Sequence, residues 1–327
     1  ASVMIISFLA HSIMFNEFLW IGLRFFAGFS FYAILIILES WLNEKSTHDN
    51  RGKILAIYSI VFYLATALGQ LFLNIEGKFR EYIFTMGSIL VLFSIILISL
   101  IKVKEPTLKP FEKYSLPKIY SVVPLAFTAS LIGGFLIGGF FTMVPIYLLE
   151  KYDSIEIVSY FMTFALVGGL LAQWPIGVLS DKYGRRKLIA FNAFVCSVTS
   201  ILFLFVIDYT LYIYTLGFFL GASIFSLYPL AVARANDVVD ENKDILEISR
   251  TLLYSYGIGS FISPLIIGFI LNYNREFLFV LFASICLFLT LYSRSKKRIA
   301  DDDMSVYVNI PAVSSPELSQ LDPRQDE

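Results

Sequence analysis

The stretch from Gly177 to Lys187, with the sequence GVLSDKYGRRK, holds several residues that could interact through charge. It joins two apolar runs and places an acid, a glycine and three consecutive bases between them. The acid can interact with the positive N-terminal end of the following helix, and Gly184 permits a sharp reversal. Because basic side chains hold short loops on the cytoplasmic side of a membrane, the pattern predicts a tight cytoplasmic loop between two membrane spans.

Two charged residues, Arg24 and Glu39, lie in one apolar run, 15 residues apart. A charge in hydrocarbon costs about 2.5–3.5 kcal/mol or more, so it faces a cavity or a partner. Fifteen residues of helix span roughly 22 Å, which keeps the two from pairing with each other. We expect Arg24 to be functional or to snorkel to the outer surface. For Glu39 we expect gating or ion pairing, proton carriage, or a place at a wetted interface.

Uncharged polar residues inside apolar runs need partners on another helix or on a solute. The candidates for a solute cavity are Gln70, Gln173, Trp174 and Asn192. Pro175 follows Trp174 and predicts a helix kink near a cavity. Packing contacts and solute contacts both stay open for these residues.

The sequence offers no residues for several other kinds of chemistry. It has no glycine loop followed by Lys-Ser/Thr, no zinc-type His-Glu pattern and no nucleophile elbow. The two cysteines, Cys196 and Cys286, lie in apolar runs without a disulfide or metal pattern. The net charge of −1 argues against nucleic acid as a partner. We expect no enzymatic activity, no metal or cofactor, and no use of ATP.

The composition predicts an all-α membrane protein. Of 327 residues, 57% are hydrophobic and 16% charged, and the mean hydropathy is +0.73. Spans of this length fit helices rather than the alternating strands of a barrel. Ten apolar runs are expected to cross the membrane: about 1–14, 18–43, 52–73, 82–101, 119–149, 157–180, 188–207, 209–232, 247–271 and 277–293.

The runs divide into two bundles, and an internal repeat relates them. We expect an incomplete N-terminal bundle at 1–103, a cytoplasmic linker at 104–118, a C-terminal bundle at 119–294, and a disordered cytoplasmic tail at 295–327. Residues 23–30 resemble residues 216–223 at an offset of 193. The same offset places the counterparts of two spans and of the loop before residue 1. We therefore expect ten of twelve spans here, numbered 3–12, with pseudo-two-fold symmetry.

The orientation follows from the basic residues of the loops. If the loop at residues 177–187 is cytoplasmic, the cytoplasmic segments hold 19 Lys and Arg and the outer loops hold 4. This ratio predicts a cytoplasmic C-terminus.

The loop resembles the signature loop of the major facilitator superfamily, G-x-x-x-D-x-x-G-R-[RK]-[RK]. The matching residues are Gly177, Asp181, Gly184, Arg185, Arg186 and Lys187. The resemblance implies two six-helix bundles and a gating role for Asp181 and Arg185, with anchoring of the loop as the alternative. Arg24-x-x-x-Gly28 resembles the superfamily's fourth-span motif, which implies a role in coupling.

A finer resemblance is to the YcaD-like branch of that superfamily. It is carried by ESWLN at 39–43, NRG at 50–52, GQ at 69–70, GGLLAQWPIG at 168–177 and ARAND at 233–237. The branch more often has His where this chain has Arg234. Asn236 and Asp237 are expected to pair with a cytoplasmic loop base or to cap the next helix.

These expectations favour a secondary active transporter that moves a small solute by alternating access. A proton or solute gradient would supply the energy, and the solute would be amphipathic or apolar. The expected location is the bacterial inner membrane, with lipid as the surrounding partner. The alternatives are a non-transporting sensor or scaffold of the same fold, and an inactive fragment.

Overall fold

The computed structural model describes residues 1–14, 16–45, 51–75, 82–100, 123–205, 209–237 and 245–296. Side chains at 40, 43–45, 51–53, 55 and 245–249 are outside this description. The described chain is helical, without strands: α1 (Ser2–Ile13), α2 (Glu17–Lys45), α3 (Arg51–Leu71), η1 (Phe72–Asn74), α4 (Ile83–Ser99), α6 (Pro124–Thr142), α7 (Val144–Tyr152), α8 (Ile155–Tyr183), α9 (Arg185–Phe203), α10 (Thr210–Asn236), α11 (Ile245–Leu271) and α12 (Phe277–Ser295).

Each predicted apolar run forms helix, which confirms the all-α prediction. Among the described residues, eight segments are long and apolar enough to cross a membrane, whereas α1 and α4 are shorter apolar helices. The fifth run differs from expectation because it is divided into α6 and α7 at Met143, with Pro145 in the first turn of α7. Pro175, where a kink was expected, lies inside α8, which is a single helix from Ile155 to Tyr183.

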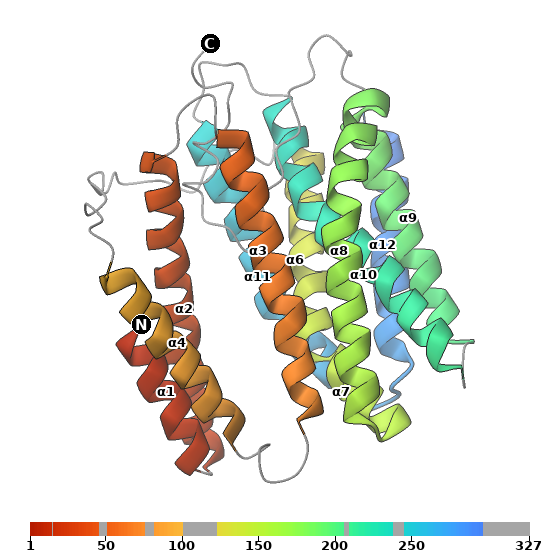
Figure 1. Cartoon of the computed structure of the whole chain (residues 1–327). Helices are drawn as coiled ribbons and strands as arrows, with labels where there is room; N and C mark the ends of the chain where they lie inside the picture. The colour runs from red at the N-terminus through yellow and green to blue at the C-terminus, as the bar shows by residue number, and fades with distance from the viewer. Residues whose placement is uncertain are drawn as a thin grey trace.

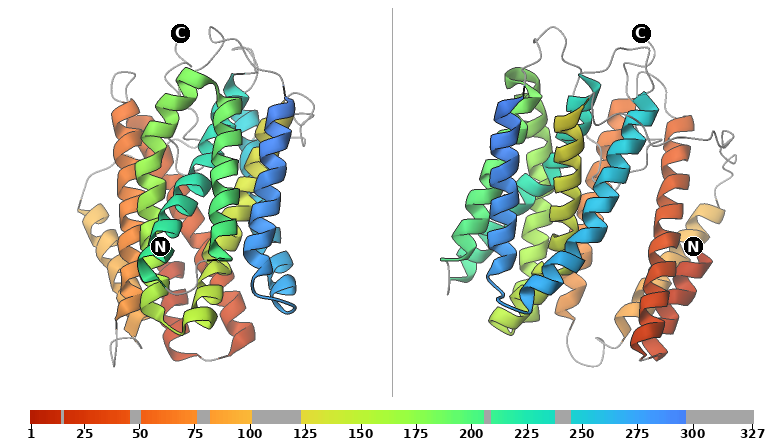
Figure 2. Two further views of the ribbon diagram at one scale, coloured as in Figure 1. Left: turned by 90° about the vertical axis from the view of Figure 1, so that its right-hand side faces the viewer. Right: turned by 180° about the vertical axis from the view of Figure 1, so that it is seen from behind.

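The helices form two groups of different size, and α3 lies between them (Figure 1). Helices α6 and α8 to α12 pack on one another, and α1 packs on α2 and α4. Helix α3 packs on α8, so it lies beside the larger group (Figure 2). The predicted linker at 104–118 and almost all of the tail at 295–327 lie outside the described residues, so the domain boundaries stay predictions.

The helix bounds repeat with the offset found in the sequence. Adding 193 to the bounds of α2 gives 210–238, and α10 covers Thr210–Asn236. The same shift brings α3 onto α11 and α4 onto α12, and α9 packs on α10 and α12 as α1 packs on α2 and α4. In the larger group α6 packs on α11, whose counterpart in the smaller group is α3. Within the described residues, the smaller group has no counterpart of α6.

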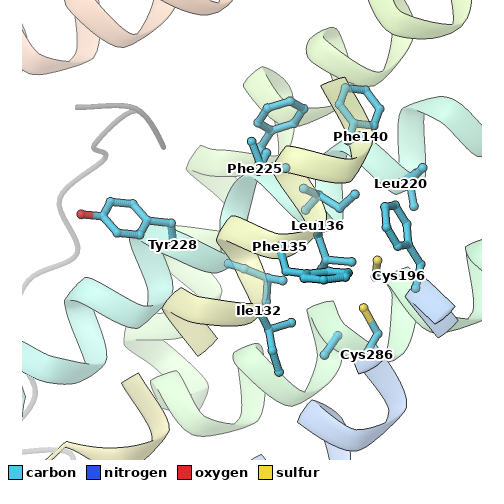
Figure 3. Packing of buried hydrophobic residues seen from close by; sticks show 14 of the residues in the cluster. Ile132, Phe135, Leu136, Phe140, Cys196, Leu220, Phe225, Tyr228 and Cys286 are labelled. Atoms are coloured by element: carbon cyan, nitrogen blue, oxygen red, sulfur yellow. The ribbon is translucent and has the colours of Figure 1, made fainter. Parts of the chain in front are cut away.

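Aromatic and aliphatic side chains fill the larger group (Figure 3). Phe140 of α6 lies edge-on to Phe225 of α10, with ring centroids 5.7 Å apart. Cys196 and Cys286, from α9 and α12, are both buried and free, and their side chains point toward each other in Figure 3. The core therefore joins α6, α9, α10 and α12.

Glycines let the helices of this group touch through their backbones. A Cβ at Gly134 would lie 2.0 Å from the carbonyl oxygen of Tyr256, and one at Gly221 would lie 1.9 Å from that of Ala165. A Cβ at Gly259 of α11 would likewise lie 2.1 Å from the carbonyl oxygen of Leu131 in α6. These contacts leave no room for a larger residue.

Two glycines on α11 give a matched test of this packing. We expect Gly259→Ala to destabilise the fold by about 1–3 kcal/mol, because its methyl group overlaps backbone atoms that cannot move independently. Gly257→Ala should be neutral or stabilising, because nothing lies within 4 Å of its Cβ position and Ala favours helix. Thermal unfolding in detergent measures both, and equal unfolding temperatures for the two variants would contradict the close approach.

Candidate gate and transport site

The loop between α8 and α9 is a single-residue turn at Gly184. Its backbone has φ 90° and ψ 139°, a conformation that is strained for residues with a Cβ. The Gly184 N–H donates to the carbonyl of Ser180 at 2.9 Å, which closes the end of α8. Gly177, one turn before Ser180 in α8, is buried. The turn thus places Asp181 and Arg185 beside each other.

Arg185 is the buried centre of this end of the molecule. It forms an ion pair with Asp181, the residue four positions earlier, and its Nη1 donates to Ser180 Oγ. Ser180 Oγ in turn donates to the Gly177 carbonyl at 2.8 Å. The Nε of Arg185 lies 3.7 Å from Oδ2 of Asp237, and both side chains are fully buried.

The C-terminal end of α10 therefore meets the signature loop. Asp237 follows the last residue of α10, and its backbone N–H donates to the Ala233 carbonyl at 3.1 Å. Arg234 is buried one turn before it, and Asn236 is half-buried. The sequence suggested a loop base as the partner of Asp237, and the structure places Arg185 there. The gating role of these residues stays a prediction.

Arg186 points the other way, to α12. Its Nη1 donates to the carbonyl oxygens of Lys296 and, at 3.2 Å, Arg294, at the C-terminal end of α12. Ser293 Oγ returns a hydrogen bond to the Arg186 carbonyl at 2.7 Å. A cation suits this position because the carbonyls at a helix C-terminus carry partial negative charge.

The two intramembrane charges of α2 have different surroundings. Glu39 is fully buried, and the Tyr58 hydroxyl of α3 donates to its Oε1 at 2.7 Å. Arg24 is exposed, and its guanidinium carbon lies 5.8 Å from the centre of the Phe84 ring of α4. The two do not pair with each other, as their spacing predicts. Tyr58 was missed, because nothing in its own sequence neighbourhood points to a carboxylate on another helix.

Tyrosine and phenylalanine rings from α3, α10 and α11 contact one another. Tyr63 of α3 is buried edge-on to Phe225 of α10, with centroids 5.6 Å apart. Tyr228 of α10 lies 5.0 Å from Tyr256 of α11 and points away from the core residues labelled in Figure 3. With 19 Tyr and 32 Phe in the chain, the sequence could not single these rings out.

The four cavity candidates do not converge. Gln173 is fully buried and neither of its side-chain polar atoms has a hydrogen-bond partner among the described residues. Trp174 beside it is 78% exposed, so the two face different surroundings. Asn192 is buried on α9, where Nδ2 lacks a described partner. Gln70 is half-buried, and its backbone carbonyl accepts from Ser159 at 2.7 Å.

The opposite helix ends carry their own ion pairs. Lys151 Nζ lies 3.3 Å from Oε1 of Glu276, and Arg275 Nε lies 2.9 Å from Oε2 of Glu150. These pairs join the end of α7 to the start of α12. Among the described residues, no group of three or more His, Cys, Asp or Glu is placed to hold a metal ion.

Comparison with known proteins identifies the family. The sequence profile described as Major Facilitator Superfamily matches residues 1–243 and 153–303. The chain belongs to the Major Facilitator Superfamily. It is 31% identical over 277 residues to the uncharacterized MFS-type transporter YE1530 of Yersinia enterocolitica, covering 82% of this chain and 70% of that protein. It is 30% identical over 269 residues to YcaD of Escherichia coli strain 536, also named an uncharacterized MFS-type transporter, covering 81% and 69%.

Membership confirms the fold class and the resemblance to the YcaD-like branch. The chain is a multi-pass integral membrane protein of a transporter family. Within the superfamily fold, the signature loop lies at one end of the larger group, and the buried cluster around Arg185 ties it to α10. The cluster is the candidate gate.

We expect Asp237→Asn to lower the thermal unfolding temperature of the purified protein. The change neutralises one of the two described carboxylates that face the buried Arg185. The cost should be about 1–3 kcal/mol, because Asp181 still balances the charge.

Asp153→Asn is the matched control. Asp153 is an exposed turn residue with φ 48°, a conformation that Asn also tolerates. Its effect should stay within about 0.5 kcal/mol. If both variants unfolded at the wild-type temperature, the buried pair would contribute nothing to the fold.

Proposed function

We propose that the chain is a secondary active transporter of a small solute, working by alternating access. The group of α1, α2 and α4, with α3, would rock against the group of α6 to α12, so that a central site opens to one side at a time. The observation that carries the proposal is the buried Arg185 cluster, built from the superfamily's signature loop and the end of α10. These ion pairs lie within the group of α6 to α12, so they would form and break locally, where the ends of α8, α9 and α10 meet, as the basic side closes and opens.

The contact between α3 and α8 supports a second closure at the opposite end. Ser159 Oγ donates to the Gln70 carbonyl at 2.7 Å, and Thr163 Oγ1 donates to the Ala67 carbonyl at 3.3 Å. Hydrogen bonds of this kind contribute about 1 kcal/mol each, because water offers the same partners when they separate. Such a contact can open without a large loss of free energy.

Glu39 and Tyr58 are the proposed coupling pair. Glu39 is fully buried on α2 and bonded to Tyr58 of α3, so a change of its charge would act on the contact between these helices. Gln173 and Asn192 offer polar atoms without described partners, which a solute could use. Little other fixed charge lies within the spans, which favours an amphipathic or apolar solute.

The proposed location is the bacterial inner membrane, with the loop at 177–187 and the C-terminus in the cytoplasm. Support comes from the excess of basic residues on that side, 19 against 4. No hydrolysis of ATP is required, since a proton or solute gradient would drive transport.

Uptake into proteoliposomes tests the function. Solutes are screened with and without an imposed pH gradient, using the full-length chain. We expect gradient-driven uptake that Glu39→Gln uncouples from pH, because the amide cannot carry a proton. Glu17→Gln, an exposed acid on the same helix, should behave as wild type. Absence of gradient-driven flux of every solute would count against a transporter, and equal coupling in the two variants would exclude Glu39.

Cross-linking tests alternating access without relying on the pH gradient. A short cross-linker between Ala67→Cys and Thr163→Cys should abolish uptake, because it ties α3 to α8. The control pair, Ala190→Cys with Thr290→Cys, lies within one group and has the same Thr-to-Ala hydrogen bond at 3.3 Å. It should leave uptake intact. Background labelling should be low because both native cysteines are buried. Unimpaired uptake by the protein cross-linked between α3 and α8 would contradict alternating access.

A further inference from the structure

A crevice of about 160 Å³ lies at the basic end of the molecule, outside the gate. Its described lining combines three basic and three apolar residues: Arg186, Lys187, Ala190, Phe191, Phe194 and Arg294. Five belong to the first three turns of α9, and Arg294 is in the last turn of α12. No acid is among these lining residues.

Among the described residues, no carboxylate forms an ion pair with the basic side chains of the crevice. Arg186 uses Nη1 on the carbonyls of Arg294 and Lys296, which are neutral groups. The described ion pairs involve Lys151, Arg185 and Arg275, and none of them includes Arg186, Lys187 or Arg294. Lys187 and Arg294 are both exposed. The crevice therefore presents concentrated positive charge to a ligand.

The helix faces that run from the crevice toward mid-membrane are apolar. On α9, Phe191, Phe194, Val198 and Leu202 are exposed and follow Lys187 at helical spacing. On α12, Leu291 and Leu287 are exposed one and two turns before Arg294. Since α9 and α12 pack on each other, basic groups lie at the end of the spans and an apolar surface continues below them.

We infer that this crevice binds an anionic glycerophospholipid. The phosphate lies among Arg186, Lys187 and Arg294, and one acyl chain lies along Phe191 and Phe194. Charge, depth and polarity all match a lipid of the leaflet at the basic end, because anionic headgroups gather near basic side chains at the membrane surface. The site joins α9 to α12, so an occupied crevice stabilises the larger helical group.

A soluble phosphate compound shares the charge but not the chain. Two of the six lining residues are phenylalanines that face outward from the helices, and a soluble anion gains nothing from them. A lipid covers both. The experiment therefore compares the lipid, a zwitterionic lipid of equal chain length, and the headgroup alone.

Native mass spectrometry of the full chain, released from mixed micelles, measures lipid retention. The probes are phosphatidylglycerol, phosphatidylcholine with the same acyl chains, and glycerol phosphate. We expect phosphatidylglycerol to be retained preferentially. Lys187→Gln should weaken it about fivefold, from the contribution of one basic side chain near a charged membrane surface. Lys187→Gln with Arg294→Gln should weaken it about 25-fold.

Lys182→Gln is the matched control, an exposed lysine five positions earlier at the same end and outside the crevice. It should retain the wild-type preference. Phe194→Ser should weaken the retention of phosphatidylglycerol without changing the fold, which circular dichroism checks. Equal retention of both lipids, equal effects of the two lysine variants, or glycerol phosphate binding as tightly as the lipid would each overturn the assignment.

Discussion

The buried guanidinium of Arg185 is the interaction on which the basic end of the molecule depends. A charge removed from water is costly unless opposite charges and hydrogen-bond acceptors surround it. Asp181 from α8 and Asp237 from the end of α10 supply the charges, and Ser180 supplies an acceptor. The ends of three helices must therefore come together around one side chain. Arg186 extends the arrangement to α12, because its side chain donates to the Arg294 carbonyl at the end of that helix.

Contacts of two different kinds hold the helices. Inside the larger group, glycines bring backbones so close that no methyl group fits, as at Gly134 and Gly221. Such surfaces are rigid because backbone atoms cannot move independently. Between α3 and α8, hydroxyl-to-carbonyl hydrogen bonds and edge-on rings join the helices instead. A rigid group with an exchangeable contact at its side is suited to rocking motions.

Lipid as the solvent accounts for the polarity of the outer surface. Exposed phenylalanines and leucines along α9 and α12 would be unfavourable in water, but hydrocarbon covers them at no cost. At the helix ends the same faces change to arginine and lysine, which remain solvated in the headgroup region. The crevice at Lys187 lies where these two surfaces meet.

Much of the fold was determined by the sequence itself. Long apolar runs must form helices in lipid, since no water can satisfy exposed backbone groups, and the repeat and the turn at Gly184 are local patterns. The division of one run at Met143 was not predicted, whereas the run at 157–180 was expected as one span and is one helix through Pro175. A proline can end a helix or be accommodated within it. Neighbouring helices settle which occurs.

Only the tertiary structure decided which side chains meet. Helices that are apolar on every side carry no amphipathic signal, so the sequence could not tell that Gln173 is buried while Trp174 is exposed. Likewise it named Glu39 and Asp237 as charges in need of partners, but not that Tyr58 meets the first. The partner of a residue depends on the rotation and neighbours of its helix, and these are set by packing between segments far apart in the chain.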